Sequence, residues 1–142
     1  MITRSATARY EGLGKEGKGR ITTQSGALSE QGYSFGTRFE NGPGTNPAEL
    51  VAAAHAACFT MALSYALAKE GLTAGSLETV ARVKLDQQGE GFAVTRSDLS
   101  LTGKVEGIEE PRFRALAEDA KANCPISKLL KAEMNLEIRF DG

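Results

Sequence analysis

Two cysteines are the residues of this chain that could most readily do chemistry, and they are its only thiols. Cys58 lies within an alanine-rich stretch, PAELVAAAHAACFTMALSYALAKEG, and Cys124 directly precedes a proline in KANCPISKLL. From this context alone, Cys58 is as readily an inert core thiol as a reactive one, because cysteine is among the most buried residue types. A core thiol combined with a second thiol at a helix end nevertheless favours redox chemistry over packing.

Cys124 is predicted to cap the N-terminus of a short helix. A residue before proline is disfavoured in helical conformation, and Pro125 suits the first position of a helix. Free N–H groups at that helix end would then stabilise a negatively charged sulfur. The sequence leaves open the alternative that a cysteine at this position is incidental.

His55 is the only histidine, and it precedes Cys58 by three residues, which places it on the neighbouring helical surface. It could act as a base or as a metal ligand. A zinc site needs four protein ligands, or three and a water, and no fourth candidate follows His55, Cys58 and Cys124. We therefore expect a core or interface histidine with a hydrogen-bond partner, and no metal.

Arg38 and Glu49 flank a loop rich in glycine, proline and asparagine. Arg38 lies in a run, SFGTRFE, that is typical of a strand, and Glu49 lies in the first turn of a predicted long helix. An arginine beside a thiolate lowers the pKa of the thiol and binds a peroxide oxygen, and a glutamate can hold its guanidinium in a bidentate pair. The helix dipole favours Glu49 whatever the function, so this residue also has a purely structural explanation.

Hydrophobic periodicity and turn residues predict a single α+β domain spanning residues 1–142. The predicted strands cover residues 2–10, 20–24, 33–39, 77–86, 92–101 and 136–140, and the predicted helices cover 47–70, 111–122 and 125–131. The first three strands are expected to form an antiparallel meander. Asn46 is the expected cap of the long helix and Gly71 its end. The apolar phase slips between Val94 and Leu99, which indicates a β-bulge.

The long helix is apolar on nearly every side, which predicts a homodimer. A chain of 142 residues offers little protein to surround such a helix, so we expect two copies of it to share one core. A strongly curled sheet that covers the helix within one chain is the alternative. Glu49 and Cys58 lie about 13 Å apart along an ideal helix and about half a turn out of phase. If both serve one site, we expect Glu49 to come from the partner chain.

Composition excludes several classes of protein. The net charge is −1 and the basic residues are dispersed, which argues against a nucleic-acid surface. The N-terminus lacks the apolar run of a secretory signal. Leu50–Ala68 is mostly alanine and is interrupted by polar residues, so a buried helix is favoured over a membrane span. We expect a cytoplasmic protein with reduced cysteines, in which a disulfide would be transient and catalytic.

Two segments resemble the OsmC subfamily of the OsmC/Ohr proteins, the osmotically inducible and organic hydroperoxide resistance group. They are TRFENGPGTNPAELVAAAHAACFTMALS, over residues 37–64, and NCPISKLL around Cys124. The resemblance covers the whole chain in the order of its elements. It implies the OsmC-like fold, with antiparallel sheets around a long central helix, in an intertwined homodimer.

The same resemblance implies a cysteine-based peroxidase that prefers organic hydroperoxides, with its active sites at the dimer interface. Cys58 matches the peroxidatic cysteine and Cys124 the resolving one. Arg38 matches the arginine that activates the thiolate and orients the substrate, and Glu49 the glutamate that pairs with it. The resemblance implies no metal, haem or flavin cofactor. It implies a dithiol reductant, and the relatives' preference for dihydrolipoyl groups makes a lipoylated protein a candidate partner.

Two other classes of function remain open on the residues alone. One is a non-enzymatic binding protein with an apolar pocket at the dimer interface and cysteines that are merely packed. The other is a metal-binding domain that uses His55 and the cysteines. Three scattered apolar residues are candidates for lining a substrate pocket and favour a bulky substrate: Phe39, Phe59 and Met61.

Overall fold

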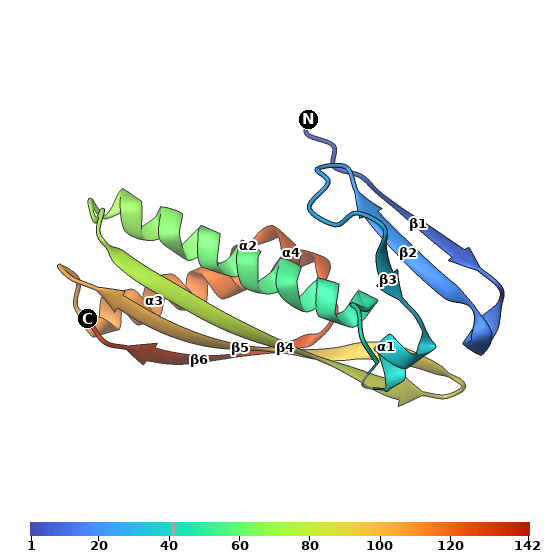
Figure 1. Cartoon of the computed structure of the whole chain (residues 1–142). Helices are drawn as coiled ribbons and strands as arrows, with labels where there is room; N and C mark the ends of the chain where they lie inside the picture. Colours follow the sequence, from blue (N-terminus) through green and yellow to red (C-terminus); the bar gives the residue numbers. More distant parts are fainter. Residues whose placement is uncertain (41) are drawn as a thin grey trace. The chain divides into compact units, whose positions relative to one another are not determined.

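The computed structural model describes residues 1–40 and 42–142, so Asn41 of the predicted glycine-rich loop lies outside the described residues. The described chain forms two compact units, a first unit Met1–Leu50 and a second unit Val51–Gly142. Its elements are β1 (Ala6–Glu11), the 3₁₀ turn η1 (Gly14–Glu16), β2 (Lys18–Thr23), β3 (Gln31–Tyr33), α1 (Phe35–Phe39), α2 (Pro47–Lys69), β4 (Gly75–Gln88), β5 (Gly91–Val105), α3 (Glu110–Asn123), α4 (Pro125–Leu129) and β6 (Glu133–Phe140) (Figure 1). The predicted α+β class is confirmed.

The first unit contains the predicted antiparallel meander, in the order β1-β2-β3. β1 pairs with β2 over its whole length, and β2 pairs with β3 through three residue pairs. The rings of Tyr10 and Tyr33 pack edge to face with their centroids 5.9 Å apart. The first strand begins at Ala6 rather than at Ile2 as predicted, because only residues from Ala6 onward pair with β2.

The strand predicted over residues 33–39 is wrong, because most of that segment forms the short helix α1. Ser34 starts the helix with a capping box, in which its hydroxyl accepts from the N–H of Thr37 and the Thr37 hydroxyl accepts from the N–H of Ser34. This reciprocal pair satisfies two backbone donors that an extended strand would have to place elsewhere. Arg38 therefore lies in the last turn of a helix.

The long helix α2 begins and ends close to the predicted positions. The Asn46 side chain accepts from the N–H of Glu49 at 2.8 Å, as expected of a cap. After Lys69 the chain turns at Gly71, whose φ of +87° lies in the left-handed region that favours glycine. The predicted end at Gly71 is therefore confirmed.

The second unit is built on a three-stranded sheet in the order β4-β5-β6. β4 and β5 form an antiparallel hairpin, and their register shifts between Lys84 and Leu85, which pair with Arg96 and Val94. Thr95 is thus the extra residue of the predicted bulge. β6 departs from the expected antiparallel pairing, because it runs parallel to β5. The α3 and α4 segment between them forms the crossover that parallel neighbours require.

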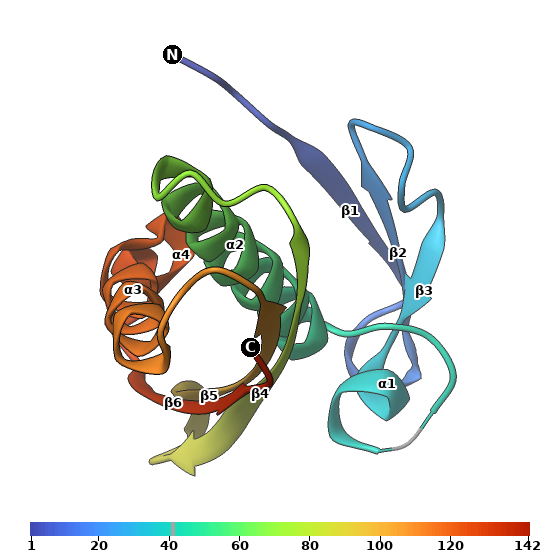
Figure 2. The same ribbon diagram turned by 90° about the vertical axis from the view of Figure 1, so that its left-hand side faces the viewer.

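The core of the second unit lies between this sheet and the helices on its concave face (Figure 2). Alternate residues of β5 point into it, and α2 and α3 contribute the facing side chains. Its fully enclosed members include Phe59, Leu63, Leu99, Leu101, Phe113 and Ala117. A continuous apolar core of this kind fixes the position of every helix that packs on the sheet.

Helix α2 buries only one stripe of its surface within the chain. His55, Phe59, Leu63 and Leu67 are buried, whereas Met61 and Tyr65 remain 58% and 66% exposed. The sheet of the second unit therefore leaves the opposite face of this apolar helix uncovered. By length and composition, α2 is also the one helix in the described part of the chain that could cross a membrane.

Gly103 in β5 is expected to be essential for packing against α3. A Cβ at residue 103 would lie 2.3 Å from Cζ of the buried Phe113 ring. Gly103→Ala should therefore lower the free energy of unfolding by about 1–3 kcal/mol, as overpacking does. Urea denaturation monitored by circular dichroism measures this change.

The control is Gly91→Ala at the other end of the same strand. A Cβ at residue 91 meets nothing closer than 4.0 Å. This variant should stay within about 0.5 kcal/mol of the parent or become slightly more stable. Equal effects of the two substitutions would contradict the close packing of Phe113 on the β5 backbone.

Candidate active site

The two cysteines meet in the second unit although 65 residues separate them in the sequence. Both are free thiols, and the Cys58 sulfur lies within hydrogen-bonding reach of the Cys124 thiol. Cys124 belongs to the buried core, and Cys58 is half-buried and packs against that core. The structure therefore brings together the two residues on which the redox interpretation depends.

The first backbone amides of α4 point at both sulfurs. Ser127 N–H donates to Cys124 Sγ at 3.4 Å, which confirms the predicted cap. The backbone N–H of Ile126 lies near enough to the Cys58 sulfur to lower the pKa of its thiol. The sequence predicted the contact with Cys124 but missed the one with Cys58. Pro125 was the available signal, because a proline at the first helical position leaves the next two amides as the free donors.

Burial raises the pKa of the Cys58 thiol above its ordinary value. The Ile126 amide acts in the opposite direction and lowers it, because an N–H donor stabilises the thiolate. The hydrogen bond and charge of Cys124 raise it again. Within this chain the balance favours the neutral thiol, so a reactive Cys58 thiolate requires an additional positive charge.

His55 is the buried, hydrogen-bonded core histidine that the sequence predicted. Its Nδ1 lies 2.6 Å from the Ser97 hydroxyl and its Nε2 lies 2.8 Å from the Ser127 hydroxyl. Burial lowers the pKa of His55, so the ring is neutral near pH 7. No local sequence pattern indicates Ser97, which reaches the ring from β5. Both ring nitrogens are satisfied, and no group of three or more potential metal ligands occurs among the described residues.

Arg38 lines an apolar pocket within the first unit. The pocket has a volume of about 430 Å³ and is lined by Tyr10, Gly14, Lys15, Tyr33, Ser34, Phe35, Arg38, Phe39 and Pro47. The guanidinium carbon lies 5.2 Å from the centroid of the Phe39 ring, which is a cation–π arrangement. A cationic group at the edge of an aromatic pocket suits a molecule with an apolar body and one polar end.

Glu49 lies in the first turn of α2 and is tied to the same unit. Its carboxylate accepts from the Thr45 hydroxyl at 2.7 Å. The Asn46 side chain caps α2 and also donates to the Thr37 carbonyl of α1 at 2.8 Å, so it connects the helices that carry Arg38 and Glu49. Within the described residues of one chain, no ion pair joins Arg38 to Glu49. Their pairing stays a prediction.

The three apolar residues that the sequence offered as pocket candidates lie in three different environments. Phe39 lines the Arg38 pocket, whereas Phe59 is wholly buried in the core and Met61 is exposed on α2.

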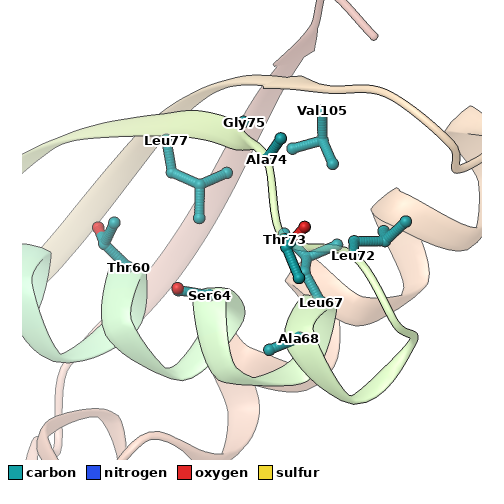
Figure 3. A pocket seen from close by; sticks show the side chains of 10 residues that line it. All are labelled: Thr60, Ser64, Leu67, Ala68, Leu72, Thr73, Ala74, Gly75, Leu77 and Val105. Atoms are coloured by element: carbon teal, nitrogen blue, oxygen red, sulfur yellow. The ribbon is translucent and has the colours of Figure 1, made fainter.

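A second cavity, of about 470 Å³, lies in the second unit between the C-terminal half of α2 and the start of β4 (Figure 3). Leu67, Leu77 and Val105 give it an apolar wall, and Thr60 and Ser64 also line it (Figure 3). Neither cysteine lines it.

The comparisons with known proteins agree on one family. Residues 40–139 match the model of the OsmC-like protein family. The chain is 48% identical over 139 residues to the protein named peroxiredoxin OsmC of Escherichia coli K12, covering 98% of this chain and 97% of that one. It is 26% identical to the organic hydroperoxide resistance protein OhrB of Bacillus subtilis, covering 86% of this chain and 88% of that one.

Solved structures share the fold at lower sequence identity. The crystal structure of OhrB of Bacillus subtilis has a TM-score of 0.70 at 24% identity and covers 99% of this chain and 98% of that one. An OsmC-like protein of unknown function from Vibrio cholerae has a TM-score of 0.78 at 18% identity, covering 97% of this chain and 99% of that one. The predicted OsmC-like fold is therefore confirmed.

The lowered pKa of His55 predicts that stability falls in mild acid. The folded ring resists protonation, whereas the ring of the unfolded chain takes up a proton as the pH falls below about 6.5. The free energy of unfolding is therefore at its full value above about pH 6.5. It decreases as the pH falls from there toward the lower pKa of the folded His55 ring. Urea midpoints at several pH values from about 7.5 to 5.5 measure this loss.

The matched variant is His55→Gln, which has no titrating ring. It should be less stable than the parent at pH 7.5 but should lose less stability on acidification. Carboxyl groups titrate alike in both proteins and cancel in the comparison. Parallel losses in the two proteins would show that the protonation of His55 does not control the acid sensitivity.

Proposed function

Because the chain belongs to the OsmC-like protein family, we propose that it is a thiol-dependent peroxidase that reduces organic hydroperoxides to alcohols. The observation that carries the proposal is the meeting of two free thiols at the first amides of α4. Cys58 is the attacking thiol in this proposal, since it is the more accessible sulfur of the two. Cys124, buried beside it, is the resolving thiol.

The first step oxidises Cys58. Its thiolate attacks the distal oxygen of the hydroperoxide, the O–O bond breaks, and the alkoxide takes up a proton to leave as alcohol. Cys58 becomes a sulfenic acid. The Ile126 amide supports the thiolate, but burial opposes it, so this step depends on a cation beside the sulfur.

Arg38 is the residue we assign to that role. Its guanidinium would lower the pKa of Cys58 and stabilise the negative charge that develops on the leaving oxygen. The aromatic pocket beside Arg38 would hold the apolar body of an organic hydroperoxide. Glu49 would hold the guanidinium in place through a bidentate pair.

The second step forms a disulfide and the third removes it. Cys124 attacks the Cys58 sulfur, the S–O bond breaks, and one water is released as the disulfide forms. An external dithiol then reduces the bond by thiol–disulfide exchange. We propose a dithiol of the dihydrolipoyl type, carried on a lipoylated protein, and a cytoplasmic location, where such reductants keep thiols reduced.

The proposed active form is a homodimer in which residues 1–142 act as one domain. Alanine, methionine and tyrosine side chains line the exposed face of α2: Ala53, Ala57, Met61, Tyr65 and Ala68. The same face of a second copy is the apolar surface of matching shape that could cover it. Such an arrangement would also let one chain supply Glu49 to a site that holds the thiols of the other.

A ligand-binding protein without catalysis is the second candidate function. The cavity of about 470 Å³ beside α2 favours it, because that cavity is mostly apolar and contains neither cysteine. The two candidates differ in thiol chemistry. Only a peroxidase loses alkylatable thiol when one equivalent of hydroperoxide is added.

Cysteine variants are expected to divide the reaction into its steps. With tert-butyl or cumene hydroperoxide and a dithiol, Cys58→Ser should abolish turnover because the attacking sulfur is gone. Cys124→Ser should still form a sulfenic acid at Cys58 but no intramolecular disulfide. Mass spectrometry after trapping with a sulfenic-acid reagent distinguishes these products. Undiminished turnover by Cys58→Ser would rule out the mechanism.

Arg38→Ala should slow the oxidation of Cys58 about 100-fold, the usual loss when one charge-stabilising donor is removed. Arg38→Lys should recover only part of the rate, because an ammonium lacks the planar fork of a guanidinium. The control is Arg9→Ala, which removes two exposed ion pairs in the same unit. Single-turnover oxidation by one equivalent of hydroperoxide gives the rate. Equal rates in Arg38→Ala and the parent would remove Arg38 from the mechanism.

Charges placed on the exposed face of α2 should separate the dimer. Met61→Lys or Tyr65→Lys would bury an unpaired ammonium at the interface and weaken association by about 3 kcal/mol or more, which is about 100-fold in Kd. Sedimentation equilibrium in detergent-free buffer measures this change. Val80→Lys, at a residue of β4 that is 42% exposed, is the control and should stay dimeric. A monomeric parent protein would contradict the proposed assembly.

A further inference from the structure

A continuous chain of hydrogen bonds runs through the second unit from Ser97 to Cys124. Ser97 Oγ contacts Nδ1 of His55 at 2.6 Å, and Ser127 Oγ contacts Nε2 of the same ring at 2.8 Å. The Ser127 hydroxyl also lies 3.1 Å from the Cys124 sulfur. All four residues are buried, so the fold determines which partners each polar atom has.

The direction of the hydrogen bonds in this chain is coupled to the protonation of Cys124. A serine hydroxyl carries one proton, and a neutral imidazole has one donor and one acceptor nitrogen. When Nε2 is the acceptor, Ser127 donates to His55 and is free to accept the proton of the Cys124 thiol. When Nδ1 and Nε2 both carry a proton, Nε2 donates to Ser127, and the Ser127 hydroxyl donates to a Cys124 thiolate. The two arrangements differ by the transfer of the thiol proton to the ring.

We propose that His55 acts through Ser127 as the proton acceptor for Cys124 during disulfide formation, an inference that rests on the peroxidase function proposed above. Cys124 gives its proton to Ser127 while Ser127 gives its own to Nε2 of His55. The Cys124 sulfur attacks the sulfenic acid of Cys58, the S–O bond breaks, and hydroxide leaves. The hydroxide takes up the proton that His55 then releases, so the sum is one disulfide and one water.

The surroundings of His55 suit a base that must remain unprotonated between turnovers. Burial lowers the pKa of His55 and is the only cause of its shift. Titratable groups on the elements that carry His55 and Ser127 include Cys58, three residues further along α2, and Cys124 at the start of α4. On β5 the charged neighbours of Ser97 are Arg96 and Asp98, which pair with each other and alternate with the core-facing residues of the strand. A neutral ring is therefore available at and below pH 7.

The same contacts assist the reductive half of the cycle. When an external thiolate attacks the Cys58 sulfur of the disulfide, Cys124 leaves as a thiolate. The Ser127 N–H already points at this sulfur, and the Ser127 hydroxyl can turn to donate to it. Ser127 touches the reacting sulfur, and His55 is a positioning residue that acts through it.

The test measures the second step alone in the full-length protein. One equivalent of tert-butyl hydroperoxide is added without reductant, and samples quenched in acid are analysed for sulfenic acid and disulfide by mass spectrometry. Ser127→Ala removes the hydroxyl but keeps the backbone N–H that donates to Cys124, the cap of α4. Ser127→Thr keeps both and is the matched control, and His55→Gln removes the base.

The rate of disulfide formation in the parent should be nearly independent of pH from about 6.5 to 8.5, because the neutral ring accepts the thiol proton. In Ser127→Ala and His55→Gln it should be about 10-fold or more slower at pH 7 and should rise with pH. Near pH 9.5 it should approach the parent rate, because hydroxide in the solvent can then replace the ring as proton acceptor. Ser127→Thr should stay within about threefold of the parent.

Two results would overturn the inference. One is a parent-like rate and pH profile in Ser127→Ala or, should that variant fail to fold, in His55→Gln. The other is equal slowing in Ser127→Ala and Ser127→Thr with a parent-like pH profile, which would indicate a purely structural role. Failure of the peroxidase function is distinguishable from both, because the parent protein would then form neither sulfenic acid nor disulfide.

Discussion

Pro125 has no N–H, so the first free amides of α4 are those of Ile126 and Ser127, and each contacts a different thiol. This arrangement makes one short helix the common partner of two sulfurs from distant parts of the sequence. Its amides favour negative sulfur, while burial of Cys58 favours the neutral thiol. The chemistry of the molecule depends on how a further positive charge changes that balance, and Arg38 is the residue assigned to provide it.

The same helix is anchored in the core through side chains that the chemistry can use. Ser127 joins α4 to His55 of α2, and His55 in turn joins α2 to Ser97 of β5. No buried side-chain nitrogen or oxygen among the described residues lacks a partner, so this polar network is complete within an otherwise apolar core. The network holds the Cys124 sulfur in a fixed geometry, and the proposed route for its proton follows the same contacts.

Much of this arrangement could be predicted from local patterns in the sequence. The bounds of α2, its Asn46 cap, the bulge in β5 and the Cys124 cap follow from capping residues and apolar periodicity. The strand predicted through Arg38 failed because the Ser34–Thr37 capping box outweighed an alternating pattern. Long-range contacts left no local signal: nothing near Ser97 indicates that it meets His55, and periodicity does not reveal that β6 runs parallel to β5.

The order of the elements along the chain also decides when the two thiols can meet during synthesis. The crossover that carries Cys124 is held at its far end by β6, which follows both cysteines in the order of the elements. A nascent chain on the ribosome therefore exposes Cys58 well before its companion sulfur has emerged. Oxidation at that stage would meet a solitary cysteine with no internal route to a disulfide. An internal disulfide therefore becomes possible only after the chain has been made well beyond the central helix.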